Sequence, residues 1–453
     1  MGTSSVPPDH SAPNNGAPGS LERLCSVSLQ ACELMNPLIS SIYQQLVSSN
    51  LGSDNWSGGL CDGVQKLKKD NSAFTIADGL VQRLLTDILY SRVSFRDVVG
   101  EEEVDGDNGV EKEGTNIEDE SWFQVQGLSI PHQLRPLVKS TKAAIDALAT
   151  ANFSSLSQNN IANHNKIVDY QNLTVFIDPI DGTREFSTGM GEQCSICIGF
   201  ANEHGKAVAG LIYRPLSQPK PTWVAGSKSE RFAAYDFGGD RVIQSLDGKM
   251  TPLLEISINE YKKRGKLLTT NGSISPFLES LIEELQMERV KSGGAGNKLM
   301  MLLEHSLFGN HADGSGVLYI QDRGVSRWDT CGAEAVLEAF GGKLIKLTTY
   351  LSETMHGEER QQSTFKGESY TYLASPTNLD FISGVATITK YNCSPSTKEV
   401  QDNQKALDVN DVKAYSNLCG LVAFGNEWNT HEGCMHIEEA IRRAARIHPP
   451  SFD

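Results

Sequence analysis

Two short acidic segments, far apart in the chain, hold the side chains best suited to chemistry. The first is DPIDGT at residues 178–183, and the second is WDTC at residues 328–331. Mg²⁺ prefers carboxylate and carbonyl oxygens as ligands, and proline and glycine allow a tight turn that can aim two carboxylates at one centre. The candidate ligands of a divalent cation are therefore Asp178, Asp181, Asp329 and the main-chain carbonyl of Ile180.

A third acidic site lies upstream, where Glu101 and Glu102 follow a strand-like run at residues 95–99. Taken alone, each site has an ordinary explanation: a solvated acidic pair, a turn, or, for Asp329, the N-cap of a helix. Three such sites, each at a strand end or a helix start, favour a metal centre. Two bound ions can stabilise the attacking and leaving oxygens of a phosphoryl group, so the pattern predicts a metal-dependent phosphomonoesterase.

A candidate base and a candidate anion site accompany these carboxylates. Thr183 stands where a helix is expected to begin, and free backbone N–H groups there favour a phosphate. Asp78 lies on a helix predicted over residues 74–89, where it could pair with the Thr183 hydroxyl and accept a proton from water. The alternative for Asp78 is an exposed helix position. The segment GGAGNK at 293–298 is no Walker A motif, but its backbone can still hold an anion.

Composition narrows the class of protein. The chain has 453 residues, a net charge of −16 and nine scattered cysteines. This acidity argues against a nucleic-acid polymer as partner, and the odd cysteine count predicts reduced thiols in a reducing compartment. No apolar run is long enough to cross a membrane, and the first residues lack a signal-peptide pattern. A cytoplasmic protein is expected, with an organelle left open.

The expected organisation is two subdomains with two insertions. Apolar spacing predicts a helix over 21–47, bent or split at Pro37, and a strand at 175–177 that ends at Asp178. Further strands and helices alternate from residue 266 onward, which favours layered α/β structure. The expected parts are a disordered arm (1–19), an α+β metal-binding subdomain (20–250, insertion 103–120), an α/β subdomain (251–447, irregular insertion 348–412) and a tail (448–453).

These segments resemble the inositol monophosphatase superfamily of lithium-sensitive, magnesium-dependent phosphatases. The resemblance covers about residues 21–447 and rests on GEE at 100–102, DPIDGT at 178–183 and WDTCGAEAVLEAFGG at 328–342, in that order. It implies an alternating αβαβα sandwich with two subdomains. It also implies two Mg²⁺ ions, with a third as an option, and inhibition by lithium.

The resemblance assigns roles position by position. It places the metal ligands at Glu101, Asp178, the Ile180 carbonyl, Asp181 and Asp329, with Glu102 next to them. It makes Asp78 and Thr183 the pair that activates the attacking water. It places substrate contacts at Gly182, Thr183, Asn271, Gly294 and Lys298.

Two branches of the superfamily suggest two different substrates. The nearest branch is the 3′(2′),5′-bisphosphate nucleotidases, which convert adenosine 3′,5′-bisphosphate to AMP. The rival branch, the inositol polyphosphate 1-phosphatases, has a helix like residues 74–82 but usually carries Ser in place of Gly182. Ile274 stands where the nucleotidase branch tends to carry His, which leaves the substrate open. A non-catalytic phosphate-binding or scaffold protein is a remote third reading, and both a monomer and a homodimer are compatible with the sequence.

Overall fold

The computed structural model describes twelve stretches of the chain, and these contain both acidic segments. They are residues 19–50, 65–67, 73–102, 121–153, 170–239, 242–245, 265–308, 316–322, 325–352, 369–373, 416–417 and 420–450. The predicted arm, apart from residue 19, and the predicted insertion at 103–120 lie outside the described residues, as do most of 348–412 and the last three residues of the tail.

The first half of the chain forms a seven-stranded sheet in the order β11-β10-β9-β8-β7-β6-β3. All neighbouring strands are antiparallel except β3 and β6, which are parallel. The strands are β3 (Asp97–Gly100), β6 (Thr174–Asp181), β7 (Ser195–Ala201), β8 (Ala207–Arg214), β9 (Thr222–Ser227), β10 (Phe232–Asp236) and β11 (Val242–Ser245).

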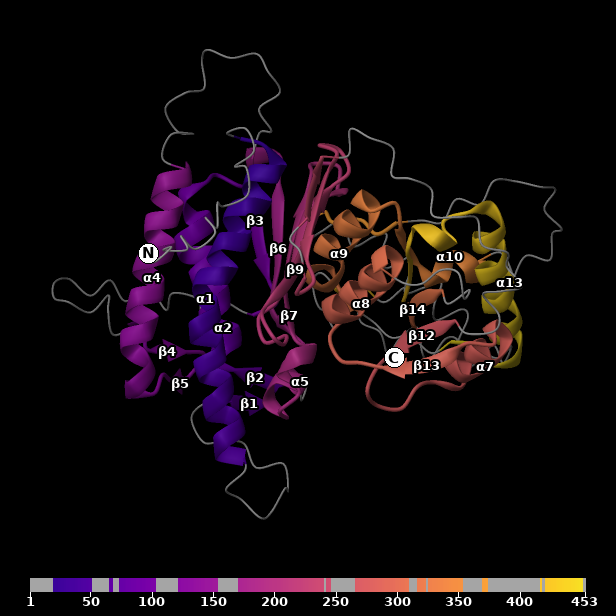
Figure 1. Cartoon of the computed structure of the whole chain (residues 1–453), viewed down its shortest axis with the longest axis horizontal. Helices are drawn as coiled ribbons and strands as arrows, with labels where there is room; N and C mark the ends of the chain where they lie inside the picture. The colour runs from indigo at the N-terminus through magenta and orange to yellow at the C-terminus, as the bar shows by residue number, and fades with distance from the viewer. Residues whose placement is uncertain are drawn as a thin grey trace, which may run out of the picture.

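Three helices lie on one side of this sheet, with α4 packed on α1 (Figure 1). They are α1 (Leu21–Asn50), α2 (Ile76–Arg83) and α4 (Arg135–Phe153). Their apolar sides and the facing strand residues form one continuous core that includes Leu38, Leu80, Ile145, Val175 and Phe200. Burying these side chains at about 25 cal/mol per Å² is the main force that holds the helices on the sheet.

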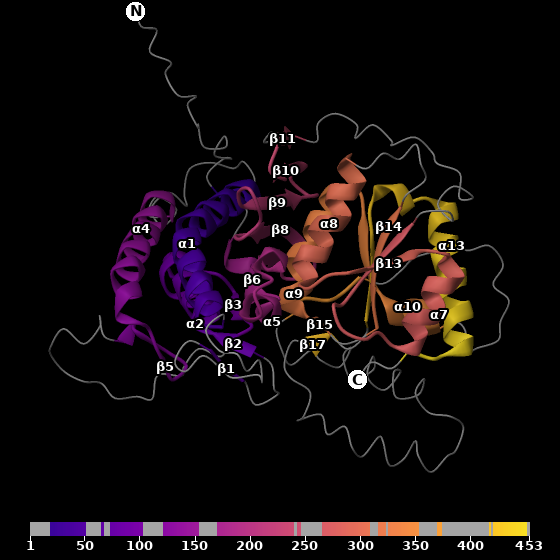
Figure 2. The same cartoon turned by 60° about the horizontal axis from the view of Figure 1, so that its bottom comes forward.

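The second half forms a five-stranded sheet in the order β13-β12-β14-β18-β16. Its strands are β12 (Lys266–Thr269), β13 (Glu288–Lys291), β14 (Val317–Gln321), β16 (Lys343–Lys346) and β18 (Leu421–Phe424). Helices α8 (Ala295–Phe308) and α9 (Arg327–Ala339) lie between the two sheets, and α7 (Pro276–Leu285), α10 (Leu347–Ser352) and α13 (His431–Ile447) cover the far face (Figure 2). The layers alternate αβαβα, which confirms the predicted fold class.

Glycine contacts bring α9 close to the first sheet. An added Cβ at Gly332 would lie 2.5 Å from the carbonyl oxygen of Ile198 on β7, and Gly199 and Gly210 face the same turn of the helix. Only residues without a side chain allow so close an approach of backbone to backbone. This contact fixes the height of α9, and so of Asp329 in its first turn, over strand β6.

The structure corrects several predicted elements. The helix expected from residue 74 begins at Ile76, after the short strand β2 (Ala73–Thr75), and continues as the π-helix η1 (Leu84–Leu89). Pro37 does not end α1, which runs as one helix to Asn50. The predicted irregular insertion at 348–412 starts inside helix α10.

That insertion also contributes to the core of the second half. Tyr370 and Tyr372 are buried, and the N–H of Tyr372 donates to the carbonyl of Gly205. Residues 369–373 therefore pack against the molecule, which the polar composition of the insertion concealed.

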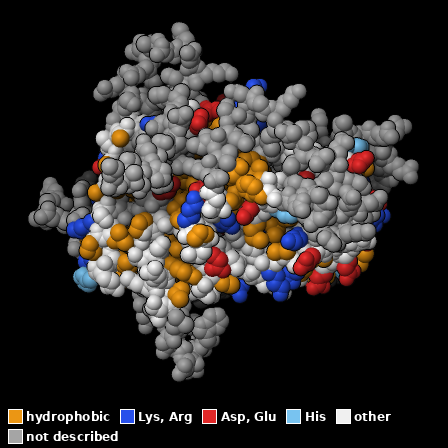
Figure 3. Space-filling view, viewed as in Figure 1, with side chains coloured by type: hydrophobic (Ala, Val, Ile, Leu, Met, Phe, Trp, Pro, Cys, Tyr) orange, Lys and Arg blue, Asp and Glu red, His pale blue; other side chains and the backbone are white. Residues whose placement is uncertain are grey.

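On the described part of the face in Figure 3, Lys and Arg side chains are mixed with Asp and Glu, and no basic stripe runs across it. No helix within the described ranges is both long enough and apolar enough to span a membrane.

Candidate active site and metal centre

A bulge in β6 places two aspartates on one side of the sheet. Asp178 pairs with Cys197 and Asp181 with Ser195, so the register shifts between these two pairs. Side chains alternate along a strand, so residues three apart normally face opposite sides, and one extra residue reverses that relation. The strand was expected to end at Asp178, but β6 continues through the bulge to Asp181.

Gly182 turns the chain directly after this bulge. Its φ of 88° lies in the left-handed region, and it is the N-cap of the short helix α5 (Thr183–Ser187). A residue with a Cβ would be strained there, which explains the glycine. The turn places Thr183 at the helix start, as predicted.

Asp329 reaches the same region from α9. It is the third residue of that helix and not its N-cap, a position that Ser326 occupies. The N–H of Ser326 donates to Asp329 Oδ2 at 2.6 Å, so the capping box orients the carboxylate.

The three aspartates form one cluster, in which Asp178 and Asp181 are buried and Asp329 is partly buried. Asp178, Asp181 and Asp329 each offer a carboxylate oxygen, and these oxygens lie within 4.8 Å of one another. Asp178 Oδ1 is buried without a hydrogen-bond partner. Burial, followed by the nearby Glu101 carboxylate, raises the pKa of Asp178 well above its ordinary value. Burial and Asp181 raise the pKa of Asp329 to about 7.

Such a cluster fits a divalent cation. Buried carboxylates that face one another repel, and an unpaired buried oxygen is costly. A hard cation between them removes both penalties and takes carboxylate oxygens as its preferred ligands. The cluster therefore has the donor set of a metal site.

Asp181 is also held by the second half of the molecule. Its Oδ1 accepts from the N–H of Ala295, and its Oδ2 accepts from the N–H of Gly296 and from Ser195 Oγ, all at 2.7 Å. The first N–H groups of α8 thus bind this carboxylate, as helix N-termini do. Ser195 was not predicted from the sequence. Its role as a support of Asp181 is visible only from the pairing of β6 with β7.

Asp78 and Thr183 meet beside the cluster. Thr183 Oγ1 lies 3.0 Å from Asp78 Oδ1 and 3.0 Å from the carbonyl oxygen of Ile180. Asp78 is fully buried, so the alternative of an exposed helix position is wrong. Its Oδ2 accepts from both the N–H and the hydroxyl of Thr75. Thr75 was not predicted, although the T-x-x-D spacing of residues 75–78 resembles a capping box.

Glu101 and Glu102 lie at the end of β3. The N–H of Glu101 donates to the carbonyl of Ile177 at 3.0 Å, which brings Glu101 alongside β6. Glu102 is buried, and its N–H donates to Gln82 Oε1 at 2.9 Å. Glu101 does not belong to the three-carboxylate cluster among the described residues, although its charge acts on Asp178.

The residues expected to contact substrate are spread along the boundary between the two halves. An added Cβ on Gly182 would lie 3.4 Å from the backbone nitrogen of Gly294, which itself has a φ of 62°. Asn271 Nδ2 donates to Glu185 and Gln193, both at 2.9 Å.

Lys298 is the most deeply buried of these residues, with 4% of its surface exposed. Its Nζ lies 5.1 Å from the ring centre of Tyr319 and 3.4 Å from the carbonyl oxygen of Ser292. Burial lowers its pKa, while the nearby Asp181 carboxylate opposes that shift.

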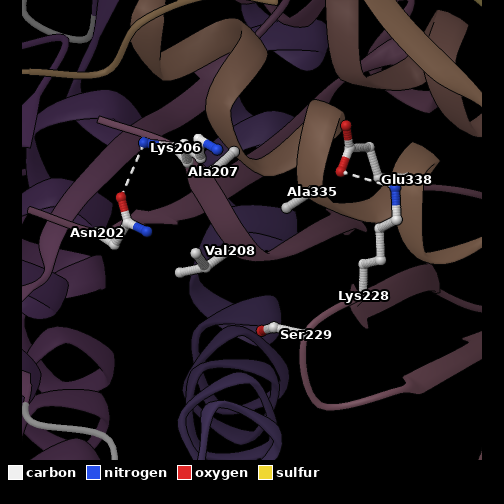
Figure 4. Close-up of a pocket in the computed structure, with 8 residues that line it drawn as sticks. All are labelled: Asn202, Lys206, Ala207, Val208, Lys228, Ser229, Ala335 and Glu338. Carbon is white, nitrogen blue, oxygen red and sulfur yellow. Dashed lines mark hydrogen bonds and ion pairs between the residues drawn. The ribbon is translucent and has the colours of Figure 1, made fainter. Parts of the chain in front are cut away.

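A separate cavity of about 280 Å³ lies near the other end of α9 (Figure 4). Lys228 and Glu338, 3.5 Å apart, form an ion pair there. None of the predicted site residues lines it. Its lining residues are Asn202, Lys206, Ala207, Val208, Lys228, Ser229, Ala335 and Glu338.

Comparison with known proteins identifies the family. Residues 137–377, more than half of the chain, match the model of the inositol monophosphatase family. The chain therefore belongs to this family, which confirms the resemblance and the phosphatase class that the sequence predicted.

Several relatives are named as nucleotidases. Human 3′(2′),5′-bisphosphate nucleotidase 1 is 26% identical over 275 residues, which cover 60% of this chain and 70% of the relative. The mouse protein of the same name is 32% identical over 38% of this chain, and the mouse Golgi-resident adenosine 3′,5′-bisphosphate 3′-phosphatase is 27% identical over 46%. The chain spans about half the length of these two mouse relatives.

Solved structures of the family are also similar. The extragenic suppressor protein suhB from Bartonella henselae aligns with a TM-score of 0.43 and 11% identity, over 92% of this chain and 98% of that one. Staphylococcal inositol monophosphatase-1 aligns with a TM-score of 0.40 and 13% identity, over 73% of this chain and 85% of that one.

Proposed function

We propose that this chain is a Mg²⁺-dependent phosphomonoesterase that hydrolyses the 3′-phosphate of adenosine 3′,5′-bisphosphate to AMP and phosphate. The observation that carries the proposal is the largely buried cluster of Asp178, Asp181 and Asp329, together with the Thr183–Asp78 hydrogen bond. Relatives named as bisphosphate nucleotidases support the substrate.

The metal-holding residues divide into two overlapping sets. Glu101, Asp178 and the Ile180 carbonyl would hold one ion, and Asp178, Asp181 and Asp329 would hold a second, with a third ion as an option. When bound, the ions would lower the pKa of the attacking water and neutralise the leaving oxygen. Asp178 belongs to both sets. Its Oδ1 is buried without a hydrogen-bond partner, which supports a role as a metal ligand.

Thr183 and Asp78 would remove the proton of the attacking water. The Thr183 hydroxyl can donate its hydrogen to Asp78 Oδ1, and its oxygen can then accept a hydrogen bond from water. The proton would pass through Thr183 Oγ1 to Asp78. Thr75 donates two hydrogen bonds to Asp78 Oδ2. These bonds fix the carboxylate so that Oδ1 points toward Thr183.

Gly182, Gly294, Asn271 and Lys298 would face the substrate. Gly294 lies next to the Gly182 turn and begins the loop whose N–H groups reach Asp181. The N–H groups of Ala295 and Gly296 already bind Asp181, so the start of α8 would hold this metal-binding carboxylate next to the phosphate. Glu102, buried behind Glu101, would support the metal ligands without contacting the substrate.

An inositol polyphosphate is the second candidate substrate. Ile274 packs against the apolar core of the second half, so this position offers no polar group to a nucleotide base. A site without that contact has less reason to select adenosine.

We further propose a cytoplasmic location and two subdomains, one for each sheet, that meet near residue 251. The six cysteines within the described ranges are buried thiols, as expected in a reducing compartment. One relative is named as Golgi-resident, which keeps an organelle as the alternative. Both a monomer and a homodimer fit the proposal.

A substrate panel tests the proposed function. Phosphate release from adenosine 3′,5′-bisphosphate and inositol 1,4-bisphosphate is measured with Mg²⁺ and with excess chelator. We expect Mg²⁺-dependent release that is faster for the nucleotide, and no release from Asp181→Asn. A faster rate with the inositol phosphate would select the second candidate. A folded protein that releases phosphate from neither would support the non-catalytic reading.

A further inference from the structure

Gln193 lies at the boundary between the two halves, in the turn η5 (Gly191–Gln193). Its Oε1 accepts from the N–H of Gly293 at 2.7 Å and from Asn271 Nδ2 at 2.9 Å. A backbone N–H can only donate, so the side-chain oxygen must be the atom that faces Gly293. One amide of the first half thus receives hydrogen bonds from two loops of the second half.

Asn271 completes the connection. The same Nδ2 donates to Glu185 Oε1 on α5 at 2.9 Å, so each amide hydrogen of Asn271 has its own acceptor. In each of these three hydrogen bonds an N–H group donates to a side-chain oxygen. We call Glu185, Gln193 and Asn271 the clasp.

The clasp lies between the two parts of the proposed site. Glu185 is two residues beyond Thr183 on α5. The carbonyl oxygen of Gln193 would lie 3.4 Å from an added Cβ on Gly182 and 2.7 Å from one on Gly294, which excludes a side chain at Gly294. On the other side, Gly293 directly precedes Gly294 and the α8 N–H groups that hold Asp181. A shift of these loops would change the distance from Thr183 to the substrate-facing backbone.

The metal-holding carboxylates have separate supports. Ser326 orients Asp329, and Ser195 with two N–H groups of α8 orients Asp181. Loss of the Gln193 side chain breaks none of these bonds. Substrate binding and metal binding should therefore respond differently to a change in the clasp.

We propose that Gln193, Asn271 and Glu185 are positioning residues that fix the loops at 270–272 and 293–294 against the Thr183 turn, and so set substrate affinity. The inference rests on the proposed function for its substrate, but the hydrogen-bonded unit itself can be measured without turnover.

Gln193→Leu tests the clasp, because leucine has a similar volume and no acceptor. The KM for adenosine 3′,5′-bisphosphate should rise about tenfold, as expected for the loss of two neutral hydrogen bonds. The Kd for Mn²⁺, measured by electron paramagnetic resonance without substrate, should stay within about twofold if the carboxylates are unaffected. The matched control is Gln133→Leu at an exposed glutamine of the turn His132–Leu134. An unchanged KM, or a loss of Mn²⁺ affinity as large as the loss in kcat/KM, would overturn the proposal.

A double-mutant cycle separates the clasp from general damage. Gln193→Leu and Asn271→Ala remove the two ends of one hydrogen-bonded unit, so the KM of the double variant should match that of the more affected single variant. Multiplying effects would mean that the residues act independently, which contradicts the clasp.

Hydrogen–deuterium exchange provides the readout that needs no activity. In Gln193→Leu, the amide of Gly293, followed in peptides within residues 290–298, should exchange about tenfold faster because it loses its acceptor. The amides of Ala295 and Gly296 keep Asp181 as their acceptor and should not change. Peptides from β8 should not change. If the wild type released no phosphate, the proposed function would be wrong, but the exchange measurement would still show whether the clasp holds the loop at residues 293–294. Unchanged exchange throughout residues 290–298 would show that the clasp does not stabilise this loop and would contradict the proposal.

Discussion

The Thr183 hydroxyl is the side chain on which the proposed proton transfer depends most directly. Its neighbours Asp78 and Ile180 come from α2 and β6, so three separate segments must agree in position. Turn chemistry in DPIDGT pointed to Thr183 and the Ile180 carbonyl, whereas Asp78 was only a candidate until the family resemblance paired it with Thr183. Neither Thr75 nor Ser195 was predicted. Thr75 holds Asp78 through a local capping box that the T-x-x-D spacing signals, whereas Ser195 reaches Asp181 only because β6 pairs with β7.

Replacing Thr183 by valine tests this residue directly. Valine keeps the shape but removes the hydroxyl, so kcat should fall by about 10²–10³, in the range that general base catalysis contributes. Affinity for Mn²⁺ should not change, because Thr183 holds no ion through its side chain in the proposed scheme. Full activity in a well-folded Thr183→Val protein would remove the proton-transfer role.

Element geometry converts scattered residues into a site. The bulge in β6 and the capping box of α9 aim Asp178, Asp181 and Asp329 at one point. The sequence identified the strand and the helix, but a bulge depends on the pairing with β7, and periodicity along one strand cannot show it. The alternative explanation of Asp329 as a helix N-cap is wrong, because Ser326 occupies that position and Asp329 is the third residue of α9.

The contact of α9 with β7 provides an element-scale prediction. Gly332→Ala should lower the free energy of unfolding by about 1–2 kcal/mol, because overpacking against the Ile198 carbonyl outweighs the better helix propensity of alanine. Thermal unfolding measures this change. Gly239→Ala is the control, since nothing lies near an added Cβ there. An unchanged Tm for Gly332→Ala would mean that α9 can move away from the sheet without cost.

Glu334 on α9 provides a prediction about pH. It accepts a hydrogen bond from the Tyr372 hydroxyl at 2.6 Å, and burial raises its pKa from 4.5 to about 8. Between these two values the unfolded chain is ionised while the folded protein keeps the proton, so this group makes stability fall as pH rises from about 4.5 to 8.

Glu334→Gln removes that titration. The variant should gain stability relative to the wild type between pH 5 and pH 8, by on the order of a few kcal/mol. Tm values of both proteins across this range measure the difference. Glu432→Gln, at an exposed position of α13, is the control and should show a constant difference. A constant difference for Glu334→Gln as well would mean that Glu334 is ionised in the folded protein.

The whole molecule is held together by a core that both sheets share. Phe176 and Cys197 of the first sheet belong to the same apolar cluster as Leu268 and Tyr319 of the second, with α8 and α9 between them. Alternating strands and helices predicted layered α/β structure in the second half, and the family resemblance supplied the full αβαβα order. The role of Tyr370 and Tyr372 in this core was missed, because their polar surroundings in the sequence resemble a loop.

A shared core predicts cooperative unfolding of the two halves. Far-UV circular dichroism and tryptophan fluorescence should report one coincident thermal transition. Trp428 lies in the shared core, and Trp223 lies on strand β9, whose Val224 belongs to that same core. Mg²⁺ should raise that Tm, since the ion binds only the folded carboxylate cluster. Two separated transitions would show that each half is stable alone.

Mg²⁺ titration of phosphate release, in the wild type and in Asp178→Asn, tests the central claim most directly. Asp178 belongs to both proposed metal sets and has the one carboxylate oxygen of the cluster that is buried without a partner in the described structure. Chelator-stripped wild type should release phosphate from adenosine 3′,5′-bisphosphate only as Mg²⁺ is added, and Asp178→Asn should lose at least about a hundredfold in rate at every concentration. Metal-independent release, or a variant that follows the wild-type curve, would contradict the metal centre and the hydrolysis built on it.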